Sequence, residues 1–238
     1  MLNYLNLTQE QRNLYLQLKK ALSNRRSISN ILETVSENDL LTVLTVGYTT
    51  RFPRGGEQTL TLLSLAIYKD NNESVDFILT HSNNKGILQE ILKISSSIHY
   101  TTSSHTYTLT PLAFAIHRSN NECINSILMK AQDSGILQNI LAYKDILQLP
   151  GLTHIFTPLT FAIHRSNNEC INSILMKAQG SGILQNILTA VSTMLLPYGW
   201  YTFNASELNE IIHHNNASIR TILDDVSIFP RLLENSRT

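Results

Sequence analysis

A stretch of 32 residues occurs twice in this chain almost unchanged. The segment from Thr110 to Leu141 returns at Thr157 to Leu188, 47 residues later, with only two substitutions. Self-similarity at a fixed period of about 20 to 50 residues is typical of proteins built from stacked units. One unit has too few large apolar side chains to offset the conformational entropy that it loses on folding. The copies are therefore expected to stack on one another.

More diverged copies flank this pair. One begins at Thr61, and another lies near the C-terminus, where Ile219 and Ile222 match Ile171 and Ile174. These matches predict one domain in five parts: a degenerate N-terminal helical cap (1–58), three repeats (59–107, 108–154 and 155–201) and a degenerate C-terminal repeat or cap (202–238).

Each repeat begins with a predicted pair of helices. Thr110 and Pro111 are typical of a helix start, because the threonine side chain caps free amides and proline is tolerated in the first turn. Asn120 and Asn121 are expected to end this helix and to begin the next. In the second helix the apolar residues recur at the spacing of a buried helical face.

A break at Ser134 and Gly135 predicts a short third helix over 136–141. The segments between the copies contain glycine, proline and β-branched residues, which favours loops or hairpins. These segments are 47–58, 95–107, 142–155 and 189–201. The sequence therefore predicts an all-α helical repeat solenoid with three helices per repeat and with intervening loops or hairpins.

The pattern Thr-Pro-Leu-x-x-Ala-Ile-x-x-x-Asn-x-x-x-Ile-x-x-Ile-Leu, at 110–128 and 157–175, resembles the helix pair of an ankyrin repeat. The resemblance covers roughly residues 59–225. Asn-Asn replaces the usual Gly-His between the helices, a third helix follows, and the period is longer than that of ankyrin. An armadillo-like or HEAT-like solenoid is the alternative, since its repeats run to about 40–47 residues.

The resemblance implies a function and a location. Ankyrin-like proteins bind other proteins through a concave helical face and through projecting hairpins, and asparagine-rich variants resemble effectors of bacteria that live inside host cells. The chain is accordingly expected in the cytoplasm, or secreted into a host cell without an N-terminal signal peptide. Its partner is expected to be a protein of unknown identity, and its oligomeric state stays open.

Composition narrows the classes of partner. The 18 basic and 18 acidic residues balance, so the chain lacks the basic excess that drives binding to nucleic acid or to anionic lipid. No apolar run approaches the roughly 20 residues that span a bilayer. We therefore expect no nucleic-acid partner and no insertion into a membrane. The two cysteines occupy equivalent repeat positions, which duplication explains without a disulfide.

Histidine and cysteine recur together in the repeat, as His117 with Cys123 and His164 with Cys170. Imidazole and thiolate are zinc ligands and can form a catalytic pair. The older copy has Tyr68 at the histidine position, so we interpret the pair as structural packing. No catalytic or phosphate-binding motif is present. We expect no metal, no cofactor and no catalytic residue, although an enzyme with dispersed catalytic residues remains the alternative.

The segments between the repeats are the predicted binding site, because loops on a rigid scaffold commonly carry binding. They are rich in aromatic residues, which together with arginine dominate binding hot spots. The candidate residues are Tyr48, Arg51, Phe52, Tyr100, His105, Tyr143, His154, Tyr198 and Trp200. The predicted function is thus a protein-protein interaction scaffold. A structural repeat protein that self-associates is a further hypothesis.

Overall fold

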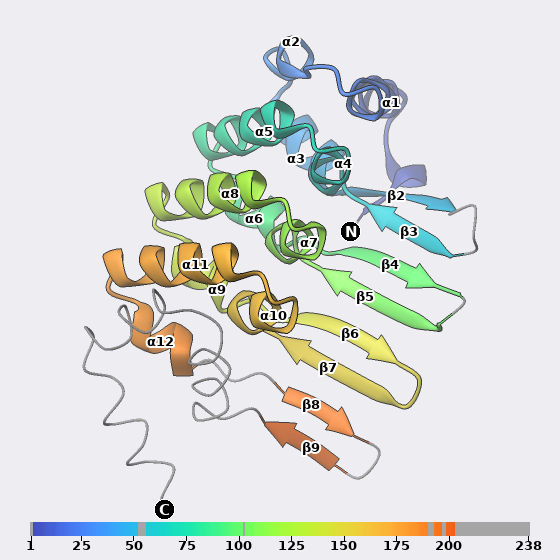
Figure 1. The fold of residues 1–238 in the computed structure, drawn as a ribbon. Helices are drawn as coiled ribbons and strands as arrows, with labels where there is room; N and C mark the ends of the chain where they lie inside the picture. Colours follow the sequence, from blue (N-terminus) through green and yellow to red (C-terminus); the bar gives the residue numbers. More distant parts are fainter. Residues whose placement is uncertain (1, 52–55, 102, 190–192, 197–198, 203–238) are drawn as a thin grey trace, which may run out of the picture.

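The computed structural model of the chain describes residues 2–51, 56–101, 103–189, 193–196 and 199–202. These residues form a stack of repeated units, in which three helices follow each of the first three β-hairpins (Figure 1). The hairpins lie side by side along one side of the stack, and the helices make up the rest. The predicted C-terminal repeat, apart from Thr202, lies outside the described residues.

Nine strands are described. They are β1 (Leu2–Asn3), β2 (Val46–Arg51), β3 (Glu57–Leu60), β4 (Ser96–Tyr100), β5 (His105–Leu109), β6 (Asp145–Leu149), β7 (Leu152–Phe156), β8 (Thr193–Leu196) and β9 (Gly199–Thr202). Four hairpins result, β2–β3, β4–β5, β6–β7 and β8–β9.

The helices fall into three equivalent sets. The first helices are α1 (Gln9–Ser23), α4 (Leu62–Tyr68), α7 (Pro111–Arg118) and α10 (Pro158–His164). The second helices are α2 (Ser29–Leu32), α5 (Asn72–Asn84), α8 (Asn121–Asp133) and α11 (Asn168–Gly180). The third helices are α3 (Glu37–Thr45), α6 (Leu88–Lys93), α9 (Leu137–Leu141) and α12 (Leu184–Thr189), and a short 3-10 helix, η1 (Tyr4–Asn6), precedes α1.

The helix starts agree with the sequence prediction. Thr110 caps α7 by accepting a hydrogen bond from the amide of Ala113 at 3.4 Å, and Pro111 occupies the first turn. Asn120 caps α8 by accepting from the amide of Cys123 at 3.0 Å. Each cap satisfies an amide that has no partner inside its own helix.

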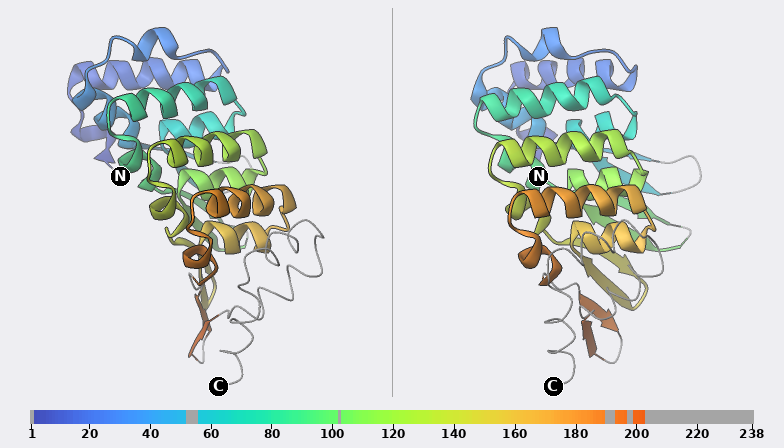
Figure 2. Two further views of the ribbon diagram at one scale, coloured as in Figure 1. Left: turned by 90° about the vertical axis from the view of Figure 1, so that its left-hand side faces the viewer. Right: turned by 60° about the vertical axis from the view of Figure 1, so that its left-hand side comes forward.

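Equivalent helices of neighbouring units pack against each other, α4 on α7 and α7 on α10 in one layer, and α5 on α8 and α8 on α11 in the next. Figure 1 shows the first helices between the hairpins and the second helices, and Figure 2 shows α5, α8 and α11 side by side on the outer surface. The side chains between these layers are fully buried, among them Leu112, Phe114, Ile124, Ile127 and Leu128. One continuous apolar core therefore runs through the stack.

The hairpins do not stand apart, because strands of neighbouring hairpins also pair. β3 pairs with β4, β5 with β6 and β7 with β8, all antiparallel, so that one sheet runs in the order β1 to β9. Only β1 and β2 pair in parallel among the described strands. Cross-strand rows follow from this register, and one of them joins Thr59, Ser97, Thr108 and Ile146.

The prediction of an all-α solenoid is therefore wrong, in its ankyrin-like form and in its armadillo-like or HEAT-like form. The fold is mixed α/β, with a nine-stranded sheet beside the stacked helices. The segments between the copies were expected to form loops or hairpins, and in the structure they contain hairpins. Their pairing into one sheet joins strands from different repeats, and no local pattern of residues signals such pairing.

Candidate binding surface

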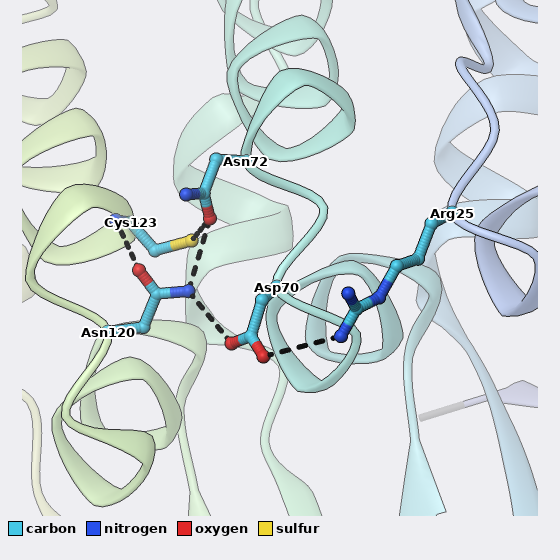
Figure 3. Close-up of polar contacts among 5 residues, drawn as sticks. All are labelled: Arg25, Asp70, Asn72, Asn120 and Cys123. Carbon is cyan, nitrogen blue, oxygen red and sulfur yellow. Dashed lines mark hydrogen bonds and ion pairs between the residues drawn. The ribbon is translucent and has the colours of Figure 1, made fainter.

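Asparagine side chains form hydrogen bonds between neighbouring units, near the point where the first helix of a unit ends and its second helix begins (Figure 3). Nδ2 of Asn120 donates to Oδ1 of Asn72 at 3.1 Å and to Oδ1 of Asp70 at 3.3 Å. The thiol of Cys123 donates to the same oxygen of Asn72 at 3.1 Å. Asp70 also forms an ion pair with Arg25 at 3.8 Å, which continues the connection toward the N-terminal unit. These contacts fix the ends of the first helices relative to one another.

The chain turns sharply just before each capping asparagine. Ser119 and Ser166 have φ angles of 55° and 53°, in the left-handed region. The next unit repeats the contact described above, since Nδ2 of Asn167 donates to Oδ1 of Asn121 at 3.1 Å. Arg118 precedes Ser119, and Arg165 precedes Ser166. The repeat therefore places one basic residue directly before each of these turns.

A continuous chain of aromatic contacts lies between the sheet and the first helices. We call it the ring cluster, and its members are Tyr100, Tyr107, His117, His154, Phe156, Phe161 and His164. The ring of Tyr107 lies 4.9 Å from that of His117, which stacks on Phe161 at 6.5 Å with a 9° angle between the planes. The cluster thus connects hairpin β4–β5 with α7, α10 and hairpin β6–β7.

The members of the ring cluster differ in how deeply they are buried. Phe156, Phe161 and His154 are buried, whereas Tyr107 and His117 are half-buried. The buried rings pack against one another: Phe156 lies 5.6 Å from His154 and 5.5 Å from Phe161. The half-buried rings present apolar surface and polar edges together, as binding hot spots do.

Basic residues border the ring cluster. Lys69, Arg118 and Arg165 occupy the same position of three successive units, and we call them the basic row. The guanidinium of Arg118 lies over the ring of Tyr68, 5.0 Å from its centre, and the ammonium of Lys69 lies 5.5 Å from the same ring. The contact orients both cations without neutralising them.

The basic row changes the electrostatics of the cluster. Burial, together with the charges of Arg165 and Arg118, lowers the pKa of His117 to about 4. Burial and then Arg165 also lower the pKa of His164. Burial raises the pKa of Tyr100, while Arg118 acts in the opposite direction. These histidines are therefore neutral at pH 7, and the positive charge of this surface comes from the basic row.

The helices and strands next to the basic row carry no exposed carboxylate, whereas Asp70, which follows Lys69, is exposed and pairs with Arg25. Helices α4, α7 and α10 contain no acidic residue, and strands β4 to β7 contain one, Asp145, which is buried. The ion pairs of the described residues are Arg25–Asp70 and Arg51–Glu57. Within the described residues, no member of the basic row has an ion pair.

Asp145 has a structural role below this surface. Its Oδ1 accepts from the backbone amide of Thr110 at 2.5 Å, and its Oδ2 accepts from the Thr110 hydroxyl at 3.2 Å. Burial raises the pKa of Asp145 to about 7, although both hydrogen bonds act to lower it. The equivalent place in the preceding unit is held by the hydroxyl of Ser96, which accepts from the amide of Thr61 at 3.3 Å.

The structure brings some of the predicted site residues together. Tyr100 and His154 belong to the ring cluster, and His105 is paired with Tyr100 across β4 and β5. Hairpins contribute four of the seven members of the cluster, but His154 is buried and contributes packing more than contact surface. The site residues predicted from the sequence all lie in the segments between the repeats, so they include no member of the ring cluster that comes from a first helix.

Other predicted site residues lie elsewhere. Tyr48 is 37% exposed, with the ammonium of Lys19 lying 3.0 Å from its ring centre. Arg51 pairs with Glu57 at 3.1 Å. Tyr143 lies near α9, 5.9 Å from the ammonium of Lys93. These three residues are not members of the ring cluster.

The remaining predicted residues are Phe52, Tyr198 and Trp200. Phe52 and Tyr198 lie outside the described residues. Trp200 lies in β9, where its backbone pairs with Leu195.

The histidine and cysteine of each repeat go to different surroundings. His117 stacks in the ring cluster, whereas the thiol of Cys123 donates to Asn72. Burial, with the nearby Glu122 and Asp70, raises the pKa of Cys123 to about 12, so the thiol is protonated at neutral pH. A protonated thiol is a poor nucleophile and a poor metal ligand. Among the described residues, no three His, Cys, Asp or Glu side chains could hold a metal ion together.

Sequence reasoning missed the first-helix members of this surface. Tyr68, His117 and His164 carry aromatic rings at equivalent positions of three repeats, and a basic residue follows each of them. This double row is visible when the repeats are aligned. Because residues 110–141 and 157–188 are nearly identical, the sequence alone favours a structural role for these positions.

Neither a protein-family model nor a curated protein matches the sequence of this chain. The resemblance to ankyrin repeats thus has no support from known families, and the sheet contradicts the all-helical fold that it implied. The implied similarity to bacterial effectors rested on the same resemblance and is withdrawn with it. No helix in the described part of the chain is long and apolar enough to cross a membrane.

Proposed function

We propose that this chain is a protein-binding module, and that the ring cluster and the basic row form its binding surface. The observation that carries the proposal is the set of half-buried rings beside three cations that form no ion pair within the described structure. Aromatic and arginine side chains contribute most to binding energy at protein interfaces. A surface of this kind spans several units and so suits a partner that contacts more than one of them.

The test is affinity capture with the purified full chain and a charge-reversed variant. Arg118→Glu with Arg165→Glu places two negative charges in the basic row, and captured proteins should be lost. Lys130→Glu with Lys177→Glu is the matched control, because these lysines are equivalent residues of the same two units on the outer helices α8 and α11. The control should capture the same proteins as the natural chain.

Circular dichroism and thermal melting establish that both double variants are folded. Loss of capture in the arginine variant alone supports the proposed surface. Unchanged capture by a folded arginine variant contradicts it.

A further inference from the structure

We propose that the partner segment is an extended acidic peptide, which runs along the stack and carries a carboxylate at every third residue. This inference rests on the proposed function and specifies the chemistry of the ligand. Its basis is the juxtaposition of the basic row with the half-buried rings, on a surface where the exposed Asp70 beside Lys69 already contacts Arg25 and Asn120.

The glutamates that begin the second helices are engaged in contacts of their own. The basic row lies at the ends of the first helices, whereas Glu122 and Glu169 lie in the first turn of the second helices. Asn72 donates a hydrogen bond to Glu122, and Asn121 donates to Glu169 at 2.5 Å. These acids are thus engaged in the contacts between units, while the basic row has no described acidic partner. Complementary charge is what selects a partner at such a surface.

The repeat sets the spacing of the ligand. Packed helices lie about 8–10 Å apart, so the helix ends that carry the basic row are separated by about that distance. A peptide in the extended polyproline II conformation advances about 3.1 Å per residue and has three residues per turn, so that every third side chain lies on the same face. Three residues therefore span one unit, and acidic side chains at i, i+3 and i+6 would meet Lys69, Arg118 and Arg165 in turn. The residues between them would contact the half-buried rings of Tyr107 and His117.

A single-stranded nucleic acid is the other ligand that arginine and aromatic groups can bind. Bases require free ring faces, but the cluster uses its own faces: His117 stacks on Phe161 and His154 stacks on Phe156, each with a 9° angle between planes. Three cations in a chain of zero net charge also give little attraction for a phosphate backbone. The observations thus favour a peptide.

The experiment measures fluorescence anisotropy of a labelled peptide of about ten residues added to the full chain. One peptide carries glutamate at every third position among serine and alanine, and a second peptide of the same composition has its glutamates adjacent. We expect the spaced peptide to bind about tenfold more tightly. Its binding should weaken as sodium chloride is raised, because salt screens exposed charges.

Variants and a competitor complete the test. The Arg118→Glu, Arg165→Glu variant should lose binding of the spaced peptide, and the Lys130→Glu, Lys177→Glu control should keep it. Equal affinity for the two peptides, or peptide binding that survives the arginine reversal, overturns the inference. Displacement of the spaced peptide by a lower concentration of a thymidine oligonucleotide overturns it in favour of nucleic acid.

The two proposals fail in different ways. If protein capture depends on the arginines but neither peptide binds, the proposed function stands and the acidic ligand is wrong. If the spaced peptide binds as expected but no protein is captured, the chemistry of the surface stands and the proposed function fails.

Discussion

The helical side and the sheet side of the stack hold neighbouring units together in different ways. On the helical side, contact is made by side chains, through the buried core and through the asparagine contacts of Asn72 and Asn120. On the sheet side, contact is made by backbone hydrogen bonds between strands of neighbouring hairpins, as between β5 and β6. The first mode depends on the identity of each residue, and the second depends much less on it.

This difference explains the distribution of sequence change. The helical part is almost identical in 110–141 and 157–188, whereas the hairpins at 96–109 and 145–156 have different sequences and turns of different length but the same antiparallel strand pairing. A sheet whose pairing is supplied by the backbone tolerates new side chains, and new side chains change what the surface binds. Substitutions on the helical side should therefore cost more stability than those on the exposed sheet face.

The largest effect is expected in the helical core. Ile127 in α8 is 0% exposed, and Ile127→Ala should destabilise the chain by about 2–5 kcal/mol, because it leaves a cavity in packed surroundings. Urea unfolding followed by circular dichroism measures this change. Met129 on the same helix is 43% exposed, and Met129→Ala should change stability by less than about 0.5 kcal/mol. Similar losses for the two variants would contradict the assigned core.

A second effect lies at the junction of sheet and helix, and depends on pH. The unfolded chain releases the Asp145 proton near pH 3.8, whereas the folded chain holds it up to about pH 7. The folded state therefore binds more protons in this window, and Asp145 lowers stability as pH rises from 4 to 7. We expect a loss of about 3 kcal/mol across the window.

Asp145→Asn and Asp145→Ser remove the titrating group, and the second introduces the residue type that Ser96 supplies at the equivalent place. The melting temperature of the natural chain should fall relative to that of each variant as pH rises from 4 to 7. The difference is the quantity to follow, because the lowered pKa of His117 makes that residue act in the opposite direction between about pH 4 and 6.5. A pH-independent difference for both variants would show that Asp145 does not titrate in this window.

A smaller effect is expected at the asparagine contacts. Asn120→Ala removes both the cap of α8 and the hydrogen bonds to the preceding unit, and should cost about 1–2 kcal/mol. Asn120→Ser keeps a capping oxygen but is too short to reach Asn72, and should cost about half as much. Chemical denaturation separates the two variants. Equal losses would mean that the contact between units contributes nothing beyond the cap.

The smallest effect is expected on the exposed face of the sheet. Thr108 is paired with Ser97 and Ile146, and Thr108→Val keeps a β-branched side chain and every backbone hydrogen bond. Its effect on stability should stay within about 0.5 kcal/mol. A loss above about 1 kcal/mol in the same denaturation assay would show that side chains, and not the backbone, hold the sheet side together.

Sequence reasoning reached the local parts of this fold and missed the non-local one. Thr110, Pro111 and Asn120 predict helix boundaries because a cap acts on amides a few residues away. The pairing of Thr108 with Ile146 joins residues of different repeats, and strand preference depends on neighbours that the sequence does not reveal. The all-α prediction failed for this reason.

The candidate surface was predicted in part for a similar reason. Tyr100 was identified from the aromatic content of a hairpin, but its neighbour His117 comes from a helix in the nearly identical part of the repeat. Only the fold places the rings of Tyr107 and His117 in contact. The evenly repeated basic residues were the available signal, and their meaning depends on knowing that they border those rings.

Strand pairing between hairpins also bears on how a chain of this kind changes in size. A further duplication of the 47-residue period would add a hairpin whose outer strand can pair with the next one, so no new type of interface would be needed. Each added copy would lengthen the recognised segment by three residues and bring one more cation. Copy number would thus set the reach and the avidity of the surface, independently of any change in the chemistry of a single unit.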